Sequence, residues 1–522
     1  MSCNAELAAA PEKTELRRDV SVWGSYMWGY ADVGADVFVA LGLVMAAAQG
    51  ATNLAFTVAG LIYILIGLAY TELASTYPVA GGGQFFTLRG LGDIWGVFAG
   101  SALLLDTTVD IALFSVACTG YLNSFIYFIL GVNLTEISVA AGPFDIKAFW
   151  LAETLLLIAT LVWLNIKGMR QASFLNEIIG IVAIIAESAI VVFGLLLAWS
   201  PELLARQWTT EFPSLDRFMY GFSLAIISFV GLETISQAAQ ETRRPATIVP
   251  RTSITLVFTV FIFAVAFSTI SLGILPWDSF IGREQEAIAL LASNIPVLGI
   301  IAGPFAAALG AAVLAISANA GVMSSSRLTY CMSRFNLLST WFNQVHPKYH
   351  TPARAIVIFS GIGAIQTCLA FLTPGAMDTL GNMYAFGASL GYTLVFIALI
   401  RLRFSDPYSP RPYKMPLNIK WRRNGRDVDV PILGFIGMLG VATILFTVVL
   451  THTIGRIAGP AWVLACLAYY IWYRRRQGLT LGTLKRDWVQ YQREVLTSAE
   501  EFELLEEYEE ALARRDKEAS RV

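Results

Sequence analysis

Two pairs of aspartates lie where a membrane-spanning helix should be most apolar. Asp32 and Asp36 fall inside one long apolar segment. Asp106 and Asp110 fall inside another, with the same spacing of four residues. An ionisable side chain at bilayer depth costs about 2.5–3.5 kcal/mol even on lenient insertion scales, so it is expected to face a cavity or a partner. Four carboxyl groups in this arrangement predict a polar pathway through a membrane protein, suited to a positively charged solute.

The spacing predicts that each pair acts as a unit. Residues four apart share one side of an α-helix, so the two members of a pair are expected to face one way, the first pair only if its helix is unbroken. Several carboxylates around one cavity cannot all be ionised without a cation. A substrate or a proton would then neutralise the cluster and permit the protein to reorient. The alternative is that one acid of each pair only accepts hydrogen bonds from backbone N–H groups at a helix break.

The elements that must position these residues are long apolar helices. Of the 522 residues, 56% are hydrophobic and 14% are charged, whereas soluble domains have about 25% charged residues. The apolar residues come in long runs, which predicts an all-α polytopic membrane protein of about twelve transmembrane helices. The expected spans are 22–48, 51–76, 94–128, 149–167, 175–199, 214–241, 251–275, 288–325, 353–373, 377–402, 431–452 and 457–474.

The distribution of charge divides the chain into three parts and orients it. Residues 1–21 are expected to form a cytoplasmic N-terminal segment without a cleavable signal peptide, residues 22–475 the transmembrane domain, and residues 476–522 a cytoplasmic amphipathic helical tail. With the N-terminus inside, all but five of the 36 Lys and Arg residues lie on the cytoplasmic side, as the positive-inside rule requires. The five exceptions are Lys147, Arg206, Arg217, Arg283 and Arg456. We therefore expect a plasma-membrane protein with both termini in the cytoplasm.

No pattern typical of an enzyme, a metal site or a bound cofactor is present in the sequence. The five cysteines are scattered, and the three histidines are too dispersed for a metal site. The net charge of −2 indicates no particular partner, and no nucleic-acid partner is predicted. The sequence therefore predicts a protein that is not an enzyme, needs no cofactor or metal, and has a small molecule and the lipid bilayer as its partners.

Two helices are expected to be broken at matching places. The first span carries Gly34 between Asp32 and Asp36, and the sixth carries an interruption from Ser228 to Glu233. Corresponding broken helices in two five-helix halves are typical of a transporter whose site lies at the bilayer midplane. Unwound backbone is tolerated there only around a cavity. The alternative is that these glycines only let neighbouring helices pack closely.

The chain resembles the amino acid–polyamine–organocation (APC) superfamily of secondary permeases over about residues 20–475. The matching stretches are Glu72-Leu-Ala-Ser-Thr-Tyr-Pro-Val-Ala-Gly-Gly-Gly83, Phe229-Val-Gly-Leu-Glu233 with Glu241-Thr-Arg-Arg-Pro245, Ser326-Arg-Leu-Thr-Tyr-Cys-Met332 with His346-Pro-Lys348, and the segment from Asn382 to Arg403. The resemblance implies a LeuT-like core of two inverted five-helix repeats with two extra helices, working by alternating access.

The resemblance also assigns roles to residues at the two breaks. The residues that it implies to line the substrate site are Gly34, Ala35, Phe229, Val230 and Gly231. Glu233 would brace the break in the sixth helix. Glu241, beside basic residues at the cytoplasmic end, would take part in gating.

The first break departs from the pattern of the family. Amino-acid permeases usually have a Gly-Ser/Thr-Gly-like run there, whose bare N–H groups hold the substrate carboxylate. This chain has Gly34-Ala35-Asp36 instead, and an ionised Asp36 would repel a carboxylate. Tyr30-Ala-Asp-Val-Gly34 and the segment around Asp106 resemble in part the KUP-type potassium uptake permeases. Carboxylates suit a hard cation and an ammonium or guanidinium group equally well.

We therefore expect a secondary active permease for amino acids or related organic cations, with an acid-lined midplane site. The acids expected to bind substrate are Asp32, Asp36, Asp106 and Asp110, and the residues expected to act in coupling or gating are Asp36, Asp106, Glu233 and Glu241. The protein would be coupled to a proton rather than to sodium, or would be an exchanger. The alternatives are a potassium uptake permease and, from another class, a permease-like solute sensor that signals through its tail. The tail would also serve to form a homodimer or to bind a cytoplasmic partner.

Overall fold

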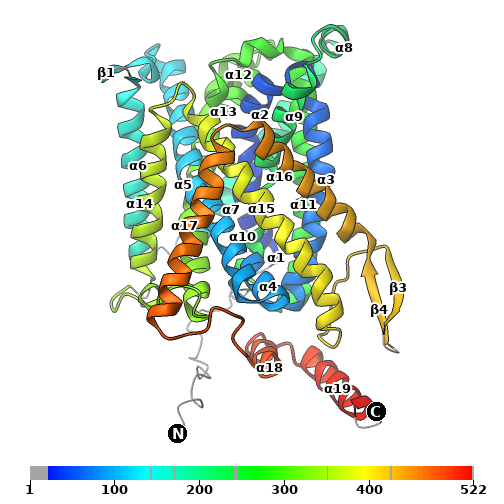
Figure 1. Cartoon of the computed structure of the whole chain (residues 1–522). Helices are drawn as coiled ribbons and strands as arrows, with labels where there is room; N and C mark the ends of the chain where they lie inside the picture. Colours follow the sequence, from blue (N-terminus) through cyan, green and yellow to red (C-terminus); the bar gives the residue numbers. More distant parts are fainter. Residues whose placement is uncertain are drawn as a thin grey trace.

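The computed structural model of the chain describes residues 22–141, 144–168, 172–239, 242, 244–349, 351–423 and 426–519. Figure 1 shows a bundle of long helices with short helices and two hairpins at its ends. The helices of the bundle are α1 (Val22–Val33), α2 (Val37–Ala48), α3 (Thr52–Thr76), α5 (Asp93–Leu130), α6 (Ala148–Lys167), α7 (Ala172–Leu197), α9 (Leu215–Leu224), α10 (Leu232–Ala238), α11 (Pro245–Ile274), α13 (Gly299–Arg334), α14 (Ala353–Ala370), α15 (Ala376–Ser405), α16 (Ile432–Thr451) and α17 (Gly455–Arg476).

Shorter elements join these helices. The short α-helices are α4 (Gly82–Leu91), α8 (Pro201–Thr210), α12 (Ala287–Ser293), α18 (Trp488–Ser498) and α19 (Phe502–Ala519). The 3₁₀ turns are η1 (Gly34–Asp36), η2 (Gln49–Ala51), η3 (Leu134–Glu136), η4 (Ala225–Phe229), η5 (Trp277–Phe280), η6 (Glu284–Glu286) and η7 (Thr340–Asn343). The strands form two antiparallel hairpins: β1 (Val139–Ala141) pairs with β2 (Phe144–Ile146), and β3 (Asn418–Arg423) pairs with β4 (Arg426–Pro431).

Every one of the expected spans contains helix. Ten continuous helical stretches of the described chain are long and apolar enough to cross a membrane, and the first of them, Gly34–Thr76, joins the second half of one expected span to the next. The last expected span, α17, is helical but is not among the ten. The prediction of an all-α polytopic membrane protein is thus confirmed, with two small hairpins added.

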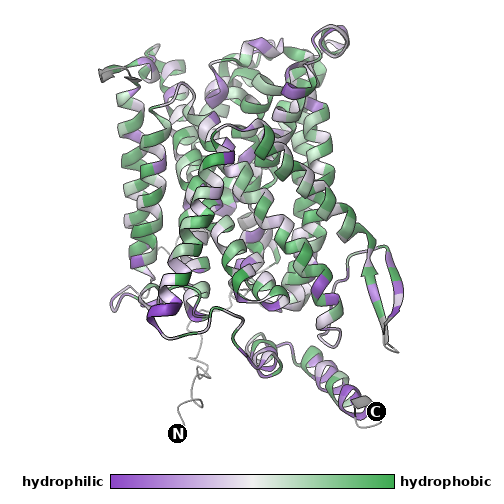
Figure 2. Cartoon of the chain, in the orientation of Figure 1, coloured by the Kyte–Doolittle hydropathy of each residue, from purple (hydrophilic) through white to green (hydrophobic). Residues whose placement is uncertain are grey.

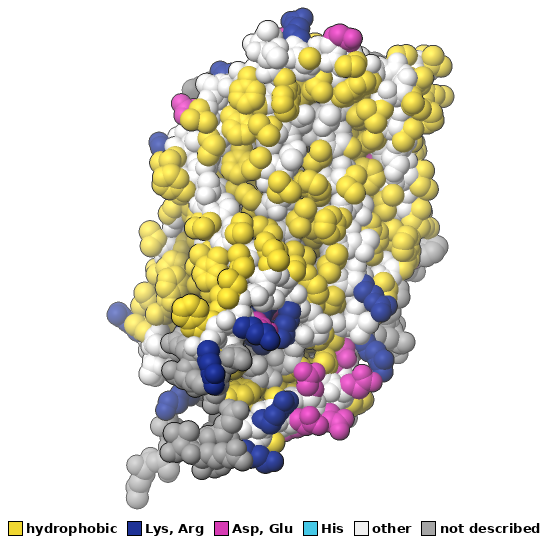
Figure 3. Space-filling view, turned by 90° about the vertical axis from the view of Figure 1, so that its right-hand side faces the viewer, with side chains coloured by type: hydrophobic (Ala, Val, Ile, Leu, Met, Phe, Trp, Pro, Cys, Tyr) yellow, Lys and Arg dark blue, Asp and Glu magenta, His cyan; other side chains and the backbone are white. Residues whose placement is uncertain are grey.

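A hydrophobic surface surrounds the bundle. Hydrophobic residues cover the long helices in Figure 2, and hydrophilic ones concentrate at the two ends and on α19. Figure 3 shows the same belt on one face, with charged side chains gathered towards its ends. Large apolar side chains such as Leu156, Ile185 and Leu196 are exposed on α6 and α7. Because exposed apolar surface on this scale is unfavourable in water, it is the surface that meets lipid acyl chains.

Most of the long helices form two sets of five, and helices of one set pack on helices of the other. In chain order, the first set is α1–α2, α3, α5, α6 and α7, and the second is α9–α10, α11, α13, α14 and α15. The second, third and fourth members pack on their counterparts: α3 on α11, α5 on α13, and α6 on α14. Equivalent helices that meet in this way are the arrangement expected of two repeats related by a two-fold axis. The interrupted helix is the first member of each set.

The two interruptions differ in kind. In the sixth span the helix is broken, since Val230 is extended and Gly231 has φ of +107° before α10 begins. In the first span, η1 only tightens the helix, because Val33, Asp36 and Val37 all keep right-handed helical backbone angles. The expectation of unwound backbone in the first helix is therefore wrong. The spacing of Asp32 and Asp36 stays that of a nearly continuous helix, so both face one side.

The helix α4 and the tail helices α18 and α19 lie at the same end of the bundle, called the α18 end below (Figure 1). The tail helix α18 begins where ordinary capping chemistry predicts. The Asp487 side chain accepts hydrogen bonds from the N–H groups of Val489 and Gln490, at 3.1 and 2.9 Å. Such an N-cap satisfies backbone donors that the helix itself leaves free.

Candidate functional site

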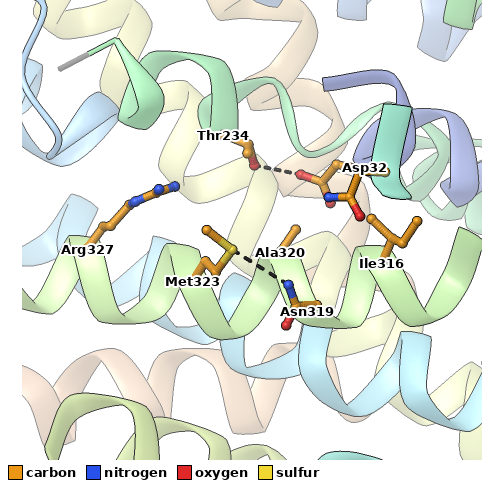
Figure 4. A pocket seen from close by; sticks show the side chains of 8 residues that line it. Asp32, Thr234, Ile316, Asn319, Ala320, Met323 and Arg327 are labelled. Carbon is orange, nitrogen blue, oxygen red and sulfur yellow. Dashed lines mark hydrogen bonds between the residues drawn. The ribbon is translucent and has the colours of Figure 1, made fainter. Parts of the chain in front are cut away.

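Asp32 lies where α1, α10 and α13 meet. Its Oδ2 accepts a hydrogen bond from Thr234 Oγ1 at 2.6 Å, and its Oδ1 accepts one from Ser317 Oγ at 3.3 Å. Figure 4 shows Thr234 and Asp32 pointing towards each other across the space between their helices. Asp32 therefore joins three helices while remaining buried.

A small cavity adjoins Asp32. It encloses about 10 Å³, which is space for about one water molecule. Its lining residues are Asp32, Asn176, Thr234, Ile316, Asn319, Ala320, Met323 and Arg327, most of them visible in Figure 4. They come from α1, α7, α10 and α13. This part of the molecule is too tightly packed to hold an amino acid, so the helices must separate for a solute to pass.

Asp106 and Glu233 lie close together. The Asp106 carboxyl on α5 is near enough to the Glu233 carboxyl on α10 for the two groups to interact. Glu233 Oε2 accepts a hydrogen bond from Tyr392 Oη on α15, at 2.9 Å. Two neighbouring buried carboxyl groups repel each other when both are ionised, so a proton or a cation near them is favoured.

Asp36 and Asp110 have buried oxygens that lack partners. Oδ1 of each accepts no hydrogen bond from the residues that the structure describes, and the Tyr384 hydroxyl of α15 lies near Asp110. Asp36 is close enough to Asp32, Asp106, Asp110 and Glu233 to interact with all four charges. An unsatisfied buried oxygen costs free energy unless a proton, a water molecule or a cation meets it. Asp106 Oδ1 is buried without a partner in the same way, so Asp36, Asp106 and Asp110 all have capacity for a ligand.

The residues of the sixth-helix break lie against the acids. Replacing the hydrogen of Gly231 by a methyl group would put that carbon 3.2 Å from Asp32 Oδ2 and 2.9 Å from Val33 Cγ2. Glycine is therefore required twice, for the positive φ and for the close approach. The Phe229 ring stacks on Tyr63 with ring centres 5.0 Å apart. Val230 is buried beside them.

The remaining predicted residues are placed as follows. Gly34 and Ala35 are buried in η1, and Gly34 lies beneath the ring of Tyr30. Glu241 falls outside the residues that the structure describes, so its expected gating role has no geometry. Phe386 of α15 packs its ring against Gly459 of α17.

Sequence reasoning missed several polar side chains at the site. Tyr63 and Tyr70 on α3 are buried, and neither hydroxyl has a hydrogen-bond partner. Tyr30 Oη donates to Glu187 Oε2 on α7, which supplies the inward partner that the buried glutamate needs. Tyrosine is common in membrane helices, so its presence alone indicates nothing. Only the spacing of these residues on faces that turn inward could have singled them out.

The arrangement as a whole is a buried acidic cluster without basic partners. In the described part of the chain, no Lys or Arg forms an ion pair with Asp32, Asp36, Asp106, Asp110 or Glu233. Among the same residues, no group of three or more His, Cys, Asp or Glu is arranged to hold a metal ion. The cluster can bind protons, or a cation whose positive charge neutralises the carboxylates.

Comparison with known proteins agrees with this geometry. The sequence profile of the family described as "Amino acid permease" matches residues 21–472. The branched-chain amino acid permease BcaP of Bacillus subtilis is 26% identical over 477 residues, which cover 90% of this chain and 96% of the relative. The cationic amino acid transporter 4 of Mus musculus is 28% identical over 410 residues, 76% of this chain and 62% of the relative.

A third relative widens the range of substrates. The methylthioribose transporter of Bacillus subtilis is 26% identical over 424 residues, 78% of this chain and 86% of the relative. None of these three is named as a potassium transporter, so the partial resemblance to KUP-type permeases receives no support. The long apolar helices, the interruptions of the first and sixth spans and the match over nearly the whole chain lead to one conclusion: the chain belongs to the amino acid permease family of membrane transporters.

Proposed function

We propose that the protein is a secondary active permease for amino acids or related organic cations, and that the positive group of its substrate binds the carboxyl cluster. The observation that carries this proposal is the set of buried carboxyl groups that converge from α1, η1, α5 and α10, with which no Lys or Arg of the described residues forms an ion pair. A buried charge is tolerated only when it is paired. The substrate or a proton supplies the missing partner.

The names of the relatives support an ammonium group as that partner. One relative is named for branched-chain amino acids and another for cationic amino acids. Amino acids of both kinds carry an α-ammonium group, which a carboxylate binds by charge-assisted hydrogen bonds. The acid-rich site favours the cationic kind, because a second positive charge would meet a second carboxylate.

Aromatic rings around the acids favour an organic cation over potassium. The edge of Phe114 meets the Tyr384 ring, with centres 5.9 Å apart, and Tyr384 in turn lies near Asp110. Tyr63 stacks on Phe229 at the other side of the break. Rings attract an ammonium or guanidinium group by cation–π interaction. Potassium instead needs a close cage of oxygens.

Proton coupling is supported by the closeness of the buried carboxyl groups of Asp106 and Glu233, which cannot both be ionised without a compensating charge. Sodium would call for hydroxyl ligands on α13. Ser325 and Ser326 instead donate to their own helix, to the carbonyl oxygens of Val322 and Met323, as such residues usually do in membrane helices. We further propose that both termini are cytoplasmic, on the bias of basic residues.

Uptake into liposomes containing the purified protein tests this proposal. Labelled arginine, labelled leucine and rubidium, a stand-in for potassium, are offered separately with and without an inward proton gradient. We expect arginine uptake to exceed that of leucine and to rise with the gradient. Uptake of rubidium alone would identify an ion importer instead. Absence of uptake for all three, with amino-acid binding retained, would favour the solute sensor.

A further inference from the structure

The tail helix α18 and the residues on either side of it bind the α18 end of the bundle, and α19 packs on α18. The first anchor is Asp93 at the start of α5, whose side chain is fully buried. It pairs with Arg474 of α17 and, through Oδ1 at 2.5 Å, with Arg486 of the tail. Arg486 also donates to the carbonyl oxygen of Phe335, at the end of α13, at 2.9 Å. This anchor ties the tail to α5 and α13.

An aromatic cluster adds to this anchor. Trp488 and Tyr491 of α18 pack on Phe85 of α4 and on Phe335, with ring centres 5.7–6.1 Å apart. Cys331 of α13 is buried in the same region, near Tyr491. The tail therefore covers the end of α13 and seals it from solvent.

The second anchor ties the tail to a different group of helices. Gln492 Nε2 donates to the carbonyl oxygen of Thr76, at the end of α3, at 2.9 Å. Glu501 Oε1 accepts a hydrogen bond from the backbone N–H of Ala246, at the start of α11, at 3.0 Å. A carboxylate at a helix N-terminus satisfies a free donor and is favoured by the helix dipole. The tail thus also holds α3 and α11.

The two groups of helices that the tail joins lie on opposite sides of the cavity beside Asp32. On one side, α1 and α10 pack on α3 and α11; on the other, α13 packs on α5. A solute can reach the acids from the α18 end only if α1 and α10 separate from α13. That movement draws the two anchors of the tail apart, because one anchor travels with each group.

We propose that the docked α18–α19 tail is a latch that holds the α18 end of the transport pathway closed, and that its release is required for this end to open. This latch would control access to the carboxyl cluster from the α18 end. Its physiological role rests on the proposed transport function, but its existence does not. The tail can leave without unfolding the surface that it binds. When Arg486 leaves, the buried Asp93 still forms its ion pair with Arg474 of α17.

The test measures reaction with a membrane-impermeant maleimide in vesicles of either orientation, and it uses the full-length chain. One reporter is Cys331, with the other cysteines replaced, which shows whether the tail has left its seat. The second is Ser317→Cys in a chain without other cysteines, which shows whether the pathway beside Asp32 has opened; Ser317 is fully buried. The latch variant combines Arg486→Ala, Trp488→Ala and Glu501→Gln, and the control is Arg515→Ala, which removes an exposed ion pair within α19.

In the latch variant, we expect both cysteine reporters to react about tenfold faster or more, because the closed–open equilibrium shifts towards the open state. The increase should appear only when the maleimide is added on the α18 side. The control variant should leave both rates unchanged. Faster labelling of Cys331 with an unchanged rate at Ser317→Cys would overturn the proposal, because the tail would then leave without opening the pathway. An unchanged rate at Cys331 would also overturn it, because the named contacts would not hold the tail. Labelling needs no substrate, so failure of the latch and failure of the proposed transport activity are distinguishable.

Discussion

At the scale of single residues, the central acids differ in how their oxygens are satisfied. Asp32 accepts hydrogen bonds from Thr234 and Ser317, so both of its oxygens are engaged within the protein. Asp36 and Asp106 each have a buried oxygen that receives no hydrogen bond from the described residues. Asp32 therefore has the features of a structural joint between helices, whereas Asp36 and Asp106 have those of groups that bind and release a charge.

Replacing Asp36 or Asp106 by asparagine should abolish transport while the protein still folds. Each change keeps the shape of the side chain but removes the negative charge that the substrate or proton neutralises. We expect the initial rate of uptake into liposomes to fall by about tenfold or more, the size of a lost charge-assisted contact. Glu153→Gln is the matched control, since Glu153 bonds to Asn123 away from the cluster. Wild-type rates in both aspartate variants would contradict the role of the cluster.

Gly231→Ala should destabilise the protein more than Gly131→Ala. Both glycines have positive φ, +107° and +69°, which costs other residues about 1–2 kcal/mol. A side chain at Gly131 would meet nothing within 4 Å, whereas at Gly231 it would press on Val33 and Asp32. Chemical denaturation of the two variants in detergent measures the difference. Equal losses of stability would show that the close approach at Gly231 is unimportant.

At the scale of elements, the sequence predicted the helices better than their interruptions. Long apolar runs identified the spans because only a helix satisfies its own backbone in lipid. The break before α10 was also predicted, since Gly231 adopts a backbone angle that few other residues can. The first interruption was overestimated: a glycine permits unwinding but does not impose it, and the Tyr30 ring packed on Gly34 holds η1 in nearly helical form.

Ion pairs at the α18 end should stabilise the junction of α3 and α15. Arg403 donates to Glu72 at 2.5 and 2.6 Å, and both side chains are buried. Arg403→Ala leaves a buried carboxylate short of its main partner, a change that typically costs about 3–5 kcal/mol. Lys414→Ala is the control: its pair with Asp429 is exposed, and such pairs contribute about 1 kcal/mol or less. Thermal unfolding of both variants checks the difference. Similar losses of stability would contradict the importance of burial.

Acid should weaken this end of the molecule through Asp406. Burial by itself would raise the pKa of Asp406, but Arg89, 2.7 Å away, more than offsets burial and holds the pKa below its usual value. The contribution of Asp406 to stability is therefore complete above about pH 3.9, the pKa of an unfolded aspartate, and is lost as the pH falls through the lower folded pKa. Because Asp406→Asn cannot titrate, its melting temperature should fall less than that of the wild type on acidification. Parallel curves would exclude this role.

At the scale of the whole molecule, the four aspartates could be predicted from the sequence because an acid in an apolar run has few explanations. The place where they meet could not be predicted, since α1, η1 and α5 come together only in the folded bundle. Asp106 and Glu233, which also lie close together, are more than a hundred positions apart in the sequence. The binding site of the tail could not be predicted either. In the sequence, Asp93 and Arg486 look like ordinary surface charges, but in the structure they form an ion pair at the α18 end.

The central claim is that the carboxyl cluster binds an organic cation. Thermal unfolding of the purified protein with arginine, leucine or potassium chloride tests it most directly, in the wild type and in Asp36→Asn. A ligand at 100 times its dissociation constant adds about 2.7 kcal/mol to the free energy of unfolding. We predict stabilisation by arginine that Asp36→Asn removes. Stabilisation by potassium alone, or by arginine equally in both proteins, would contradict the claim.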